Sequence, residues 1–301
     1  MEPRLAIVVP SRDRPELLAD CLAAVAASRR PGDELIVADS ASTTQGTARA
    51  ADRAGARVVR CDRPGASAAR NAAAASTDAE VLLFTDDDCL PAGGWASAMA
   101  EPFVDPTVGW ATGRVAADRE TRLPLSVTDG LAGRRFRRGD DPFDAGHGAN
   151  MAFRRSALLS AGGFDEALGA GVALGGAEDA DALWRVLQLG WEGVQVPGAV
   201  VVHRQWRPES TAMRSQWRYG LGAGAFAVKA HRLGMDPDWL LLRRAAWERS
   251  AALLPRHLRA GYQTGAAADA LRFAGALIGS VTGRFKRLGA GNFSPVTGAM
   301  P

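Results

Sequence analysis

The chain has 301 residues, of which 47% are hydrophobic and 23% charged, and its formal net charge at pH 7 is +3. This length allows one large domain or two small ones, and the composition is ordinary for a globular protein. The small net charge does not favour nucleic-acid binding, so we expect no nucleic-acid partner. Three cysteines without a CxxC pair argue against a disulfide framework or a structural zinc site.

Strand and helix patterns alternate through the first 115 residues. Residues 5–9 form a short apolar run, and 15–27 place apolar side chains on one helical face after a proline suited to a first turn. The alternation continues with expected strands at 34–38, 57–60 and 81–84 and expected helices at 47–54 and 66–75. This β-α-β order predicts a mainly parallel central sheet covered by helices on both faces, an α/β fold.

The pattern changes after residue 115. Residues 118–144 are polar, rich in arginine and glycine, and weakly periodic, which predicts a loop-rich insertion. The elements expected after it are a strand at 150–153, helices at 155–161 and 179–189, and two short strands within 194–202 that break at Pro197-Gly198.

The last third of the chain, from about Thr211, is predicted to be helical. Residues 241–301 contain nine Lys/Arg and two Asp/Glu. A basic amphipathic segment can dock on an anionic membrane surface; alternatively, these helices pack on their own domain and present a basic face to water. The aromatic and aliphatic side chains beside or among the charges are Trp239, Trp247, Phe273, Leu277, Ile278 and Phe285.

The N-terminus runs almost directly into a strand-like segment and shows no apolar core of a signal peptide. No apolar stretch reaches the roughly 18 residues that span a bilayer. We therefore expect a cytoplasmic protein, or one that is peripheral on the inner face of the membrane.

Three consecutive aspartates, Asp86, Asp87 and Asp88, follow the strand expected at 81–84. Adjacent carboxylates repel one another, so a compensating cation is expected. Mg²⁺ and Mn²⁺ prefer oxygen ligands and commonly share substrate phosphates. Because ligands of open α/β sheets bind beyond the carboxyl ends of strands, the triplet predicts a metal–phosphate site. The alternative is a solvated acidic turn.

Other polar residues are expected at the same rim of the sheet. Pro10, Ser11 and Arg12 end the first strand, and Asp39 ends the second. Arg70 lies in a helix that opens with small residues, where it can pair with phosphate or stack on a base. Asp39 is equally explained as a turn residue, and Arg70 as a surface arginine.

The order and spacing of seven segments resemble the family-2 inverting glycosyltransferases, which have the GT-A fold. The segments are IVVPSRDRP (7–15), LIVADSAS (35–42), GASAARN (65–71), FTDDDC (84–89), GANMAFR (148–154), GGFDE (162–166) and AEDAD (177–181). The resemblance ends near His203 and covers about two thirds of the chain.

This resemblance implies a domain organisation. A GT-A domain is expected over residues 1–210, with a nucleotide-sugar-binding half at 1–115 and an acceptor and catalytic-base half at 116–210. Residues 211–301 then form a C-terminal helical extension.

The resemblance also implies a donor and a metal. The DxD signature of the family maps onto Asp86 and Asp88, with Asp88 as the best direct ligand of Mn²⁺ or Mg²⁺ and His203 as a further ligand. Such a metal would bridge the diphosphate and act as a Lewis acid on the departing nucleotide. The implied contacts of a UDP-, dTDP- or GDP-linked sugar are Pro10, Ser11, Arg12, Asp39, Arg70, Asp86 and Asp87.

The Glu-Asp pair of the family maps onto Glu178 and Asp179. The resemblance implies that Asp179 is the general base of a single displacement, an effect typically worth roughly 10²–10⁴-fold. Asp179 is also explained as a helix cap, and Asp181 is a fallback base. The acceptor is a hydroxyl of a glycan, a lipid-linked compound or a small molecule, and its expected contacts are Asn150, His147 and Trp206.

The chain departs from the family at two places. Ser11-Arg12-Asp13 replaces a threonine, an aromatic residue and an asparagine, and Ala41-Ser42 stands where a second aspartate is usual. These changes leave the donor base and sugar open. A nucleotidyltransferase-like metal enzyme is an alternative, although the basic, glycine-rich triphosphate loop is missing after the first strand. A non-catalytic sugar-binding relative is another.

Overall fold

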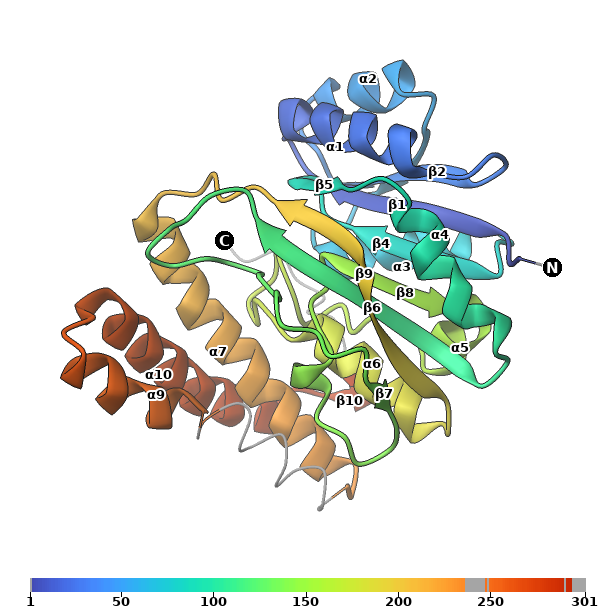
Figure 1. Ribbon diagram of the computed structural model, residues 1–301. Helices are drawn as coiled ribbons and strands as arrows, with labels where there is room; N and C mark the ends of the chain where they lie inside the picture. Colours follow the sequence, from blue (N-terminus) through green and yellow to red (C-terminus); the bar gives the residue numbers. More distant parts are fainter. Residues whose placement is uncertain (1, 236–246, 248, 290, 294–301) are drawn as a thin grey trace.

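A nine-stranded mixed sheet forms the centre of the computed structural model, which describes residues 2–235, 247, 249–289 and 291–293 (Figure 1). The strand order is β3-β2-β1-β4-β8-β6-β9-β5, and β7 also pairs with β9. The strands are β1 (Leu5–Ser11), β2 (Glu34–Ser40), β3 (Arg57–Cys61), β4 (Val81–Thr85), β5 (Cys89–Pro91), β6 (Val108–Ala117), β7 (Arg135–Phe136), β8 (Asn150–Arg154) and β9 (Glu192–His203).

The first four strands are parallel neighbours, as the alternating sequence pattern predicts. The second half of the sheet is mixed, because β8 runs antiparallel to both β4 and β6, and β5 and β7 run antiparallel to β9. The predicted α/β fold with a helix-covered central sheet is confirmed.

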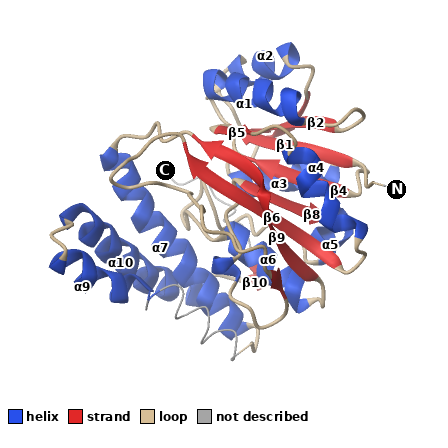
Figure 2. Ribbon diagram, viewed as in Figure 1, coloured by secondary structure: helices blue, strands red, loops and turns tan. Residues whose placement is uncertain are grey.

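Helices cover both faces of the sheet (Figure 2). Successive side chains of a strand point to opposite faces, so Leu5, Ile7 and Val9 of β1 pack with α1, α2 and α4, while Ala6 and Val8 pack with α3, α5 and α6. These helices are α1 (Pro15–Ser28), α2 (Gly46–Arg53), α3 (Ala66–Ala75), α4 (Trp95–Ala100), α5 (Arg155–Ser160) and α6 (Glu178–Gln188).

The prediction of two short strands that break at Pro197-Gly198 was wrong. β9 is one strand, and its pairing with β6 shifts register between Gly113, opposite Val196, and Arg114, opposite Val200. The extra residues form a bulge, which accommodates a proline without ending the strand. The strand therefore continues to His203.

The insertion expected at 118–144 is loop-rich, as predicted. Its regular elements among the described residues are the two-residue strand β7 and the short 3-10 helix η2 (Pro142–Asp144), which follows 3-10 helix η1 (Glu101–Val104) in the chain.

The C-terminal region consists of three described helices and a small hairpin. They are α7 (Glu209–Arg232), α9 (Arg249–Arg259), α10 (Gln263–Phe285), β10 (Leu288–Gly289) and β11 (Asn292–Phe293). α7 shares a hydrophobic cluster with α6, in which the rings of Trp184 and Phe226 lie 5.6 Å apart. The boundary expected near residue 210 therefore does not divide the hydrophobic core. Among the described residues, no helix is both long and apolar enough to cross a membrane.

Glycines bring α7 and α10 unusually close together. A side chain at Gly279 of α10 would place its Cβ 2.0 Å from the carbonyl oxygen of Leu221 in α7, and one at Gly224 would lie 1.9 Å from the carbonyl oxygen of Ala276. These contacts are with backbone atoms, which cannot rotate away.

Gly279→Ala is expected to lower the free energy of unfolding by about 1–3 kcal/mol, because the two helices must move apart. Gly130→Ala is the matched control, since a Cβ at Gly130 meets no atom within 4 Å. Thermal and denaturant unfolding of both variants measures the difference. Equal effects of the two substitutions would contradict the close helix contact.

Candidate active site

A cavity of about 640 Å³ lies beyond the carboxyl ends of β1 and β4, at the start of α6. Residues of the C-terminal helices complete its wall. Its lining includes Pro10, Ser11, Arg12, Arg70, Asp86, Asp88, His147, Glu178, Asp179, His203, Arg207, Tyr219, Leu253 and Arg272. Most of the residues expected at the donor and metal site therefore meet in one cavity.

Asp88 is the most heavily paired carboxylate of the cavity. Trp206 Nε1 donates to its Oδ2 at 2.9 Å, and Arg207 lies 3.0 Å from the same oxygen. His203 Nε2 lies 3.4 Å from Oδ1, and Arg14 reaches Oδ2 at 3.5 Å. Burial opposes ionisation of Asp88, but the partners outweigh it, His203 and Arg207 first, and lower its pKa. Asp88 is thus a buried anion held by cationic and N–H groups.

Asp87 points away from the cavity. Ser11 Oγ donates to its Oδ2 at 2.7 Å, and Arg14 lies 3.0 Å from Oδ1. Burial raises the pKa of Asp87 to about 7, although Arg14 opposes this. Asp87 is fully buried and is not among the lining residues. Its position is that of a support for Ser11 and Arg14, which do line the cavity.

Arg70 joins the aspartate triplet to the start of α6. Its guanidinium donates to Asp86 Oδ1 at 2.8 Å and to Glu178 Oε1 at 3.1 Å, and only 2% of its surface is exposed. The surface-arginine explanation of Arg70 is therefore wrong. Burial raises the pKa of Glu178 to about 7, and the adjacent Asp179 adds to this.

Asp179 lies half-buried on the cavity wall, in the first turn of α6. Its Oδ2 accepts the N–H of Gly148 at 2.7 Å, and its Oδ1 accepts the N–H of Ala180 at 2.8 Å. Two backbone donors thus fix the orientation of the carboxylate. Each carboxylate oxygen has a second lone pair that can accept a further proton or hydrogen bond.

Asp181, the fallback base, is unsuited to that role. It is fully buried, with Lys229 Nζ 2.7 Å from Oδ1 and Arg185 2.8 Å from Oδ2. Lys229 also lies 2.8 Å from Asp165, so this ion cluster ties α7 to α6 rather than facing the cavity. The fallback hypothesis is rejected because no acceptor hydroxyl can reach Asp181.

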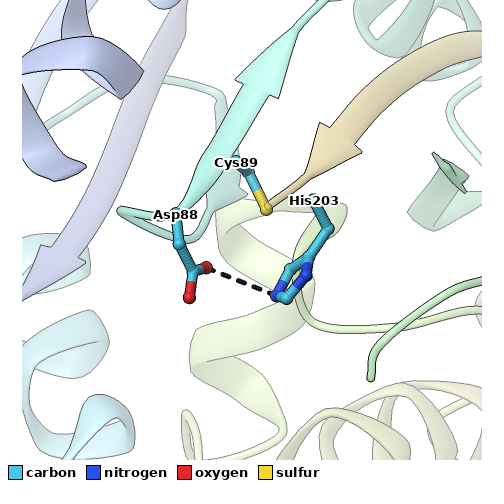
Figure 3. A group of neighbouring side chains, drawn as sticks. All are labelled: Asp88, Cys89 and His203. Atoms are coloured by element: carbon cyan, nitrogen blue, oxygen red, sulfur yellow. Dashed lines mark ion pairs between the residues drawn. The ribbon is translucent and has the colours of Figure 1, made fainter. Parts of the chain in front are cut away.

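The neighbourhood of Asp88 fits a divalent cation. Ligand atoms of Asp88, Cys89 and His203 all lie within 4.8 Å of one another (Figure 3). Burial raises the pKa of the Cys89 thiol well above its usual value, so the sulfur stays protonated and is a poor ligand. Carboxylate oxygens of Asp88 and Asp86 suit Mg²⁺ or Mn²⁺ best.

The hydrogen bonds of His203 indicate its tautomer. Gln205 Oε1 accepts the N–H of Leu125 at 2.9 Å and Gln205 Nε2 donates to the carbonyl oxygen of Leu125 at 3.0 Å, which orients the amide. The same Nε2 lies 2.8 Å from His203 Nδ1. Nδ1 therefore accepts, Nε2 carries the hydrogen and can donate toward Asp88, and ligation through Nε2 requires the other tautomer.

Two expected contacts, Asn150 and Asp39, have other roles in the structure. Asn150 is fully buried, accepts from Trp95 Nε1 and donates to the carbonyl oxygens of Arg114 and Ala199. The prediction that it contacts the acceptor is wrong, because its amide holds three strands together. Asp39 binds Ser42 N–H and Arg60 with its two oxygens, so it has the turn role that the sequence also allowed.

The two other acceptor-side residues differ in position. His147 lines the cavity, and burial lowers its pKa. Trp206 lies at 42% exposure with its ring beside the guanidinium groups of Arg14 and Arg207, and its N–H is committed to Asp88.

Sequence reasoning missed Arg14 and Arg207 as site residues. Each lies within four residues of a strand end that carries a predicted site residue, namely Pro10-Ser11 and His203. That closeness was the available signal. The wall formed by Tyr219, Leu253 and Arg272 had no comparable signal, because these residues come from helices outside the recognised motifs.

The fold and the cavity together define a class of protein, the GT-A glycosyltransferases. A mixed sheet presents a DxD pair at the end of β4 and a Glu-Asp pair at the start of α6 to one cavity. Residues 6–160 match glycosyl transferase family 2, and the chain belongs to this family.

Among curated proteins, the chain is similar to Pre-mycofactocin glycosyltransferase of Mycobacterium tuberculosis, represented by two strains. The two sequences are 27% identical over 180 residues, which is 55% of this chain and 35% of the relative. The chain therefore spans about a third of the length of the curated relative.

Solved structures share the fold at low sequence identity. The mannosyltransferase PcManGT from Pyrobaculum calidifontis, in complex with GDP-Man and Mn²⁺, aligns with a TM-score of 0.61 and 20% identity over 93% of this chain and 88% of that one. GalNAc-T7 with UDP, GalNAc and Mn²⁺ aligns with a TM-score of 0.54 and 16% identity over 73% of this chain and 47% of that one. Glucosyl-3-phosphoglycerate synthase from Mycobacterium tuberculosis aligns with a TM-score of 0.51 and 21% identity over 72% of this chain and 77% of that one.

Proposed function

We propose that this chain is a metal-dependent, inverting glycosyltransferase that moves a sugar from a nucleoside-diphosphate donor to an acceptor hydroxyl. The observation that carries the proposal is that Asp88 and Asp179 line the same cavity, one paired with N–H and cationic groups and the other oriented by two backbone donors. Complexes of structural relatives with GDP-Man or UDP together with Mn²⁺ support the donor class.

The chain's own residues account for the proposed displacement. Asp179 takes the proton of the acceptor hydroxyl as its oxygen attacks the anomeric carbon, and the bond from that carbon to the diphosphate oxygen breaks. Attack from the face opposite the nucleotide inverts the configuration. Arg14 and Arg207 stand beside Asp88, where they can pair with diphosphate oxygens. A divalent metal held by Asp88 and Asp86 would stabilise the charge on the departing nucleotide.

The acceptor end of the cavity is partly apolar. Leu125, Val127, Phe143, Ala223 and Leu253 line it together with Arg272. This wall favours an acceptor with an apolar portion, such as a lipid-linked hydroxyl compound, over a free glycan. Membrane contact through the C-terminal helices is part of the same proposal.

Incubation with a panel of UDP-, dTDP- and GDP-sugars, with and without Mn²⁺ or Mg²⁺, tests the proposed function. The expected result is metal-dependent transfer or slow hydrolysis that releases a nucleoside diphosphate. Release of pyrophosphate would instead indicate the nucleotidyltransferase alternative, and binding without turnover would indicate a sugar-binding relative. Transfer activity that EDTA leaves unchanged would refute the proposed metal dependence.

His203 offers a separate test of its proposed role as a metal ligand. Because ligation needs the lone pair of Nε2, adding Mg²⁺ is expected to move the ring hydrogen from Nε2 to Nδ1 and to turn the Gln205 amide. Nitrogen-15 NMR of the histidine side chains, with His203→Gln used for assignment, reports the tautomer directly. A His203 resonance that keeps its hydrogen on Nε2 at saturating metal would exclude it as a ligand.

A further inference from the structure

α10 turns four large apolar side chains toward solvent. Leu277, Ile278, Val281 and Phe285 are 44%, 51%, 57% and 83% exposed. Together with three alanines and Leu271 at helical spacing they form one continuous apolar face, which carries no charged residue within α10. This apolar face consists of Ala267, Ala270, Leu271, Ala274, Leu277, Ile278, Val281 and Phe285.

The opposite face of α10 has the smallest side chains and packs against α7. Gly275 and Gly279 approach the backbone carbonyls of Trp217 and Leu221, and Gly220 of α7 approaches the carbonyl of Arg272 in return. A helix on a water-soluble core normally buries its large apolar residues and exposes polar ones. The arrangement in α10 is the reverse. Small residues between helices and large apolar residues outside are typical of helices in contact with lipid.

Basic side chains border the apolar face at both ends. Exposed Arg256 and Arg259 close α9, next to the start of α10, and exposed Arg284 and Arg287 lie at its other end. Leu258, between the first two, is 61% exposed. Along the described residues 249–289 the one acidic residue is Asp269, which is buried and bonded to His257. The charge on this surface is therefore positive and complements an anionic one.

We propose that the apolar face of α10 lies in the headgroup region of an anionic phospholipid bilayer, with the helix parallel to the membrane. Apolar side chains enter the acyl boundary, and the arginines at the two ends pair with anionic headgroups. This inference specifies the membrane contact of the proposed function and does not depend on the transfer chemistry. Trp239, expected beside the same surface, lies outside the described residues.

The position of the cavity gives this contact a consequence. Leu253 of α9 and Arg272 of α10 line the cavity, so the helices that would touch the bilayer also form the acceptor wall. An acceptor with an acyl or polyisoprenyl chain can then keep its chain in the lipid while its hydroxyl reaches Asp179. The class of acceptor that fits is an amphiphile anchored in the membrane.

Flotation of the full chain with vesicles tests the proposal. The wild type is expected to float with vesicles of phosphatidylcholine and phosphatidylglycerol, and to bind phosphatidylcholine alone more weakly. Ile278→Gln/Val281→Gln/Phe285→Gln should weaken binding to the anionic vesicles about tenfold or more, since three apolar side chains lose their burial. The matched control is Val104→Gln/Leu159→Gln, which changes side chains that are 66% and 42% exposed on the other half of the molecule.

A charge pair of variants tests the basic ends. The double variant Arg284→Gln/Arg287→Gln should reduce binding to anionic vesicles and the salt dependence of that binding. The control variant Arg29→Gln/Arg53→Gln changes exposed arginines at the C-terminal ends of α1 and α2 and should leave both unchanged. Melting curves identify any variant that fails to fold.

Three outcomes would overturn the proposal. They are a wild type that does not float, an α10 triple variant that floats as well as its control, and a wild type that sediments as a dimer which the triple variant dissociates without any vesicle binding. The last result would assign the face to a second copy of the chain. Vesicle binding without glycosyl transfer would refute the proposed activity and leave the membrane contact standing.

Discussion

Asp179→Asn is expected to reduce glycosyl transfer by roughly 10²–10⁴-fold while the affinity for the nucleotide changes only a few-fold. The amide has nearly the same shape and its oxygen can still accept the N–H of Gly148, so the side chain keeps its place in the cavity wall while the hydrogen bond from the N–H of Ala180 is lost. An amide cannot take a proton from the acceptor hydroxyl. The loss should therefore fall on the chemical step alone.

Single-turnover transfer and calorimetric titration of the nucleoside diphosphate separate these two quantities. Asp52→Asn, an exposed aspartate of α2, is the control for a change of charge away from the cavity. An equal loss of nucleotide affinity and of transfer would mean that Asp179 supports the donor and is not the base. Full activity of the variant would mean that another group of the cavity accepts the proton. The adjacent carboxylate of Glu178 is the first candidate.

Asp88→Ala is expected to abolish the increase in nucleoside diphosphate affinity that Mn²⁺ produces. Because a direct metal ligand is lost, the affinity measured with Mn²⁺ should fall by roughly a hundredfold. In the absence of metal, the same substitution should not lower the affinity for the nucleoside diphosphate. Arg207 is paired with Asp88 at 3.0 Å, and removal of that carboxylate frees its guanidinium group for phosphate, whereas Arg14 stays paired with Asp87. Metal-free affinity should therefore stay the same or rise.

Isothermal titration with and without Mn²⁺ measures both effects of Asp88→Ala. Asp87→Asn provides the matched comparison one position earlier, because Asp87 points away from the cavity and contacts Ser11 and Arg14. It should retain the Mn²⁺ dependence even where it lowers stability. Unchanged metal enhancement in Asp88→Ala would reject this residue as the ligand.

Much of the fold could be predicted from the sequence, because strand and helix periodicity are local properties. The first four strands and α1 to α3 lie close to the expected ranges. β4 and the position of the aspartate triplet after it were predictable because one short apolar run is followed directly by charged residues. The strand from Val108 to Ala117 and the continuity of β9 were not predicted. Their course depends on pairing with each other and on a bulge at Pro197-Gly198, which are tertiary features.

The sequence by itself determined which residue types meet at the carboxyl ends of the strands: the aspartate triplet, Arg70, the Glu178-Asp179 pair and His203. Only the tertiary structure decided their division of labour, because three consecutive side chains cannot all face one cavity. Asp86 and Asp88 line it and Asp87 supports Ser11 and Arg14 from behind.

Partners distant in sequence were likewise decided by the fold. Arg207 and Trp206 reach Asp88, while Lys229 neutralises Asp181 and removes it as a base. Composition in the last third indicated a basic amphipathic segment. Which face of α10 is apolar and exposed followed from the glycines that pack it against α7, since close backbone contact is possible only where side chains are absent.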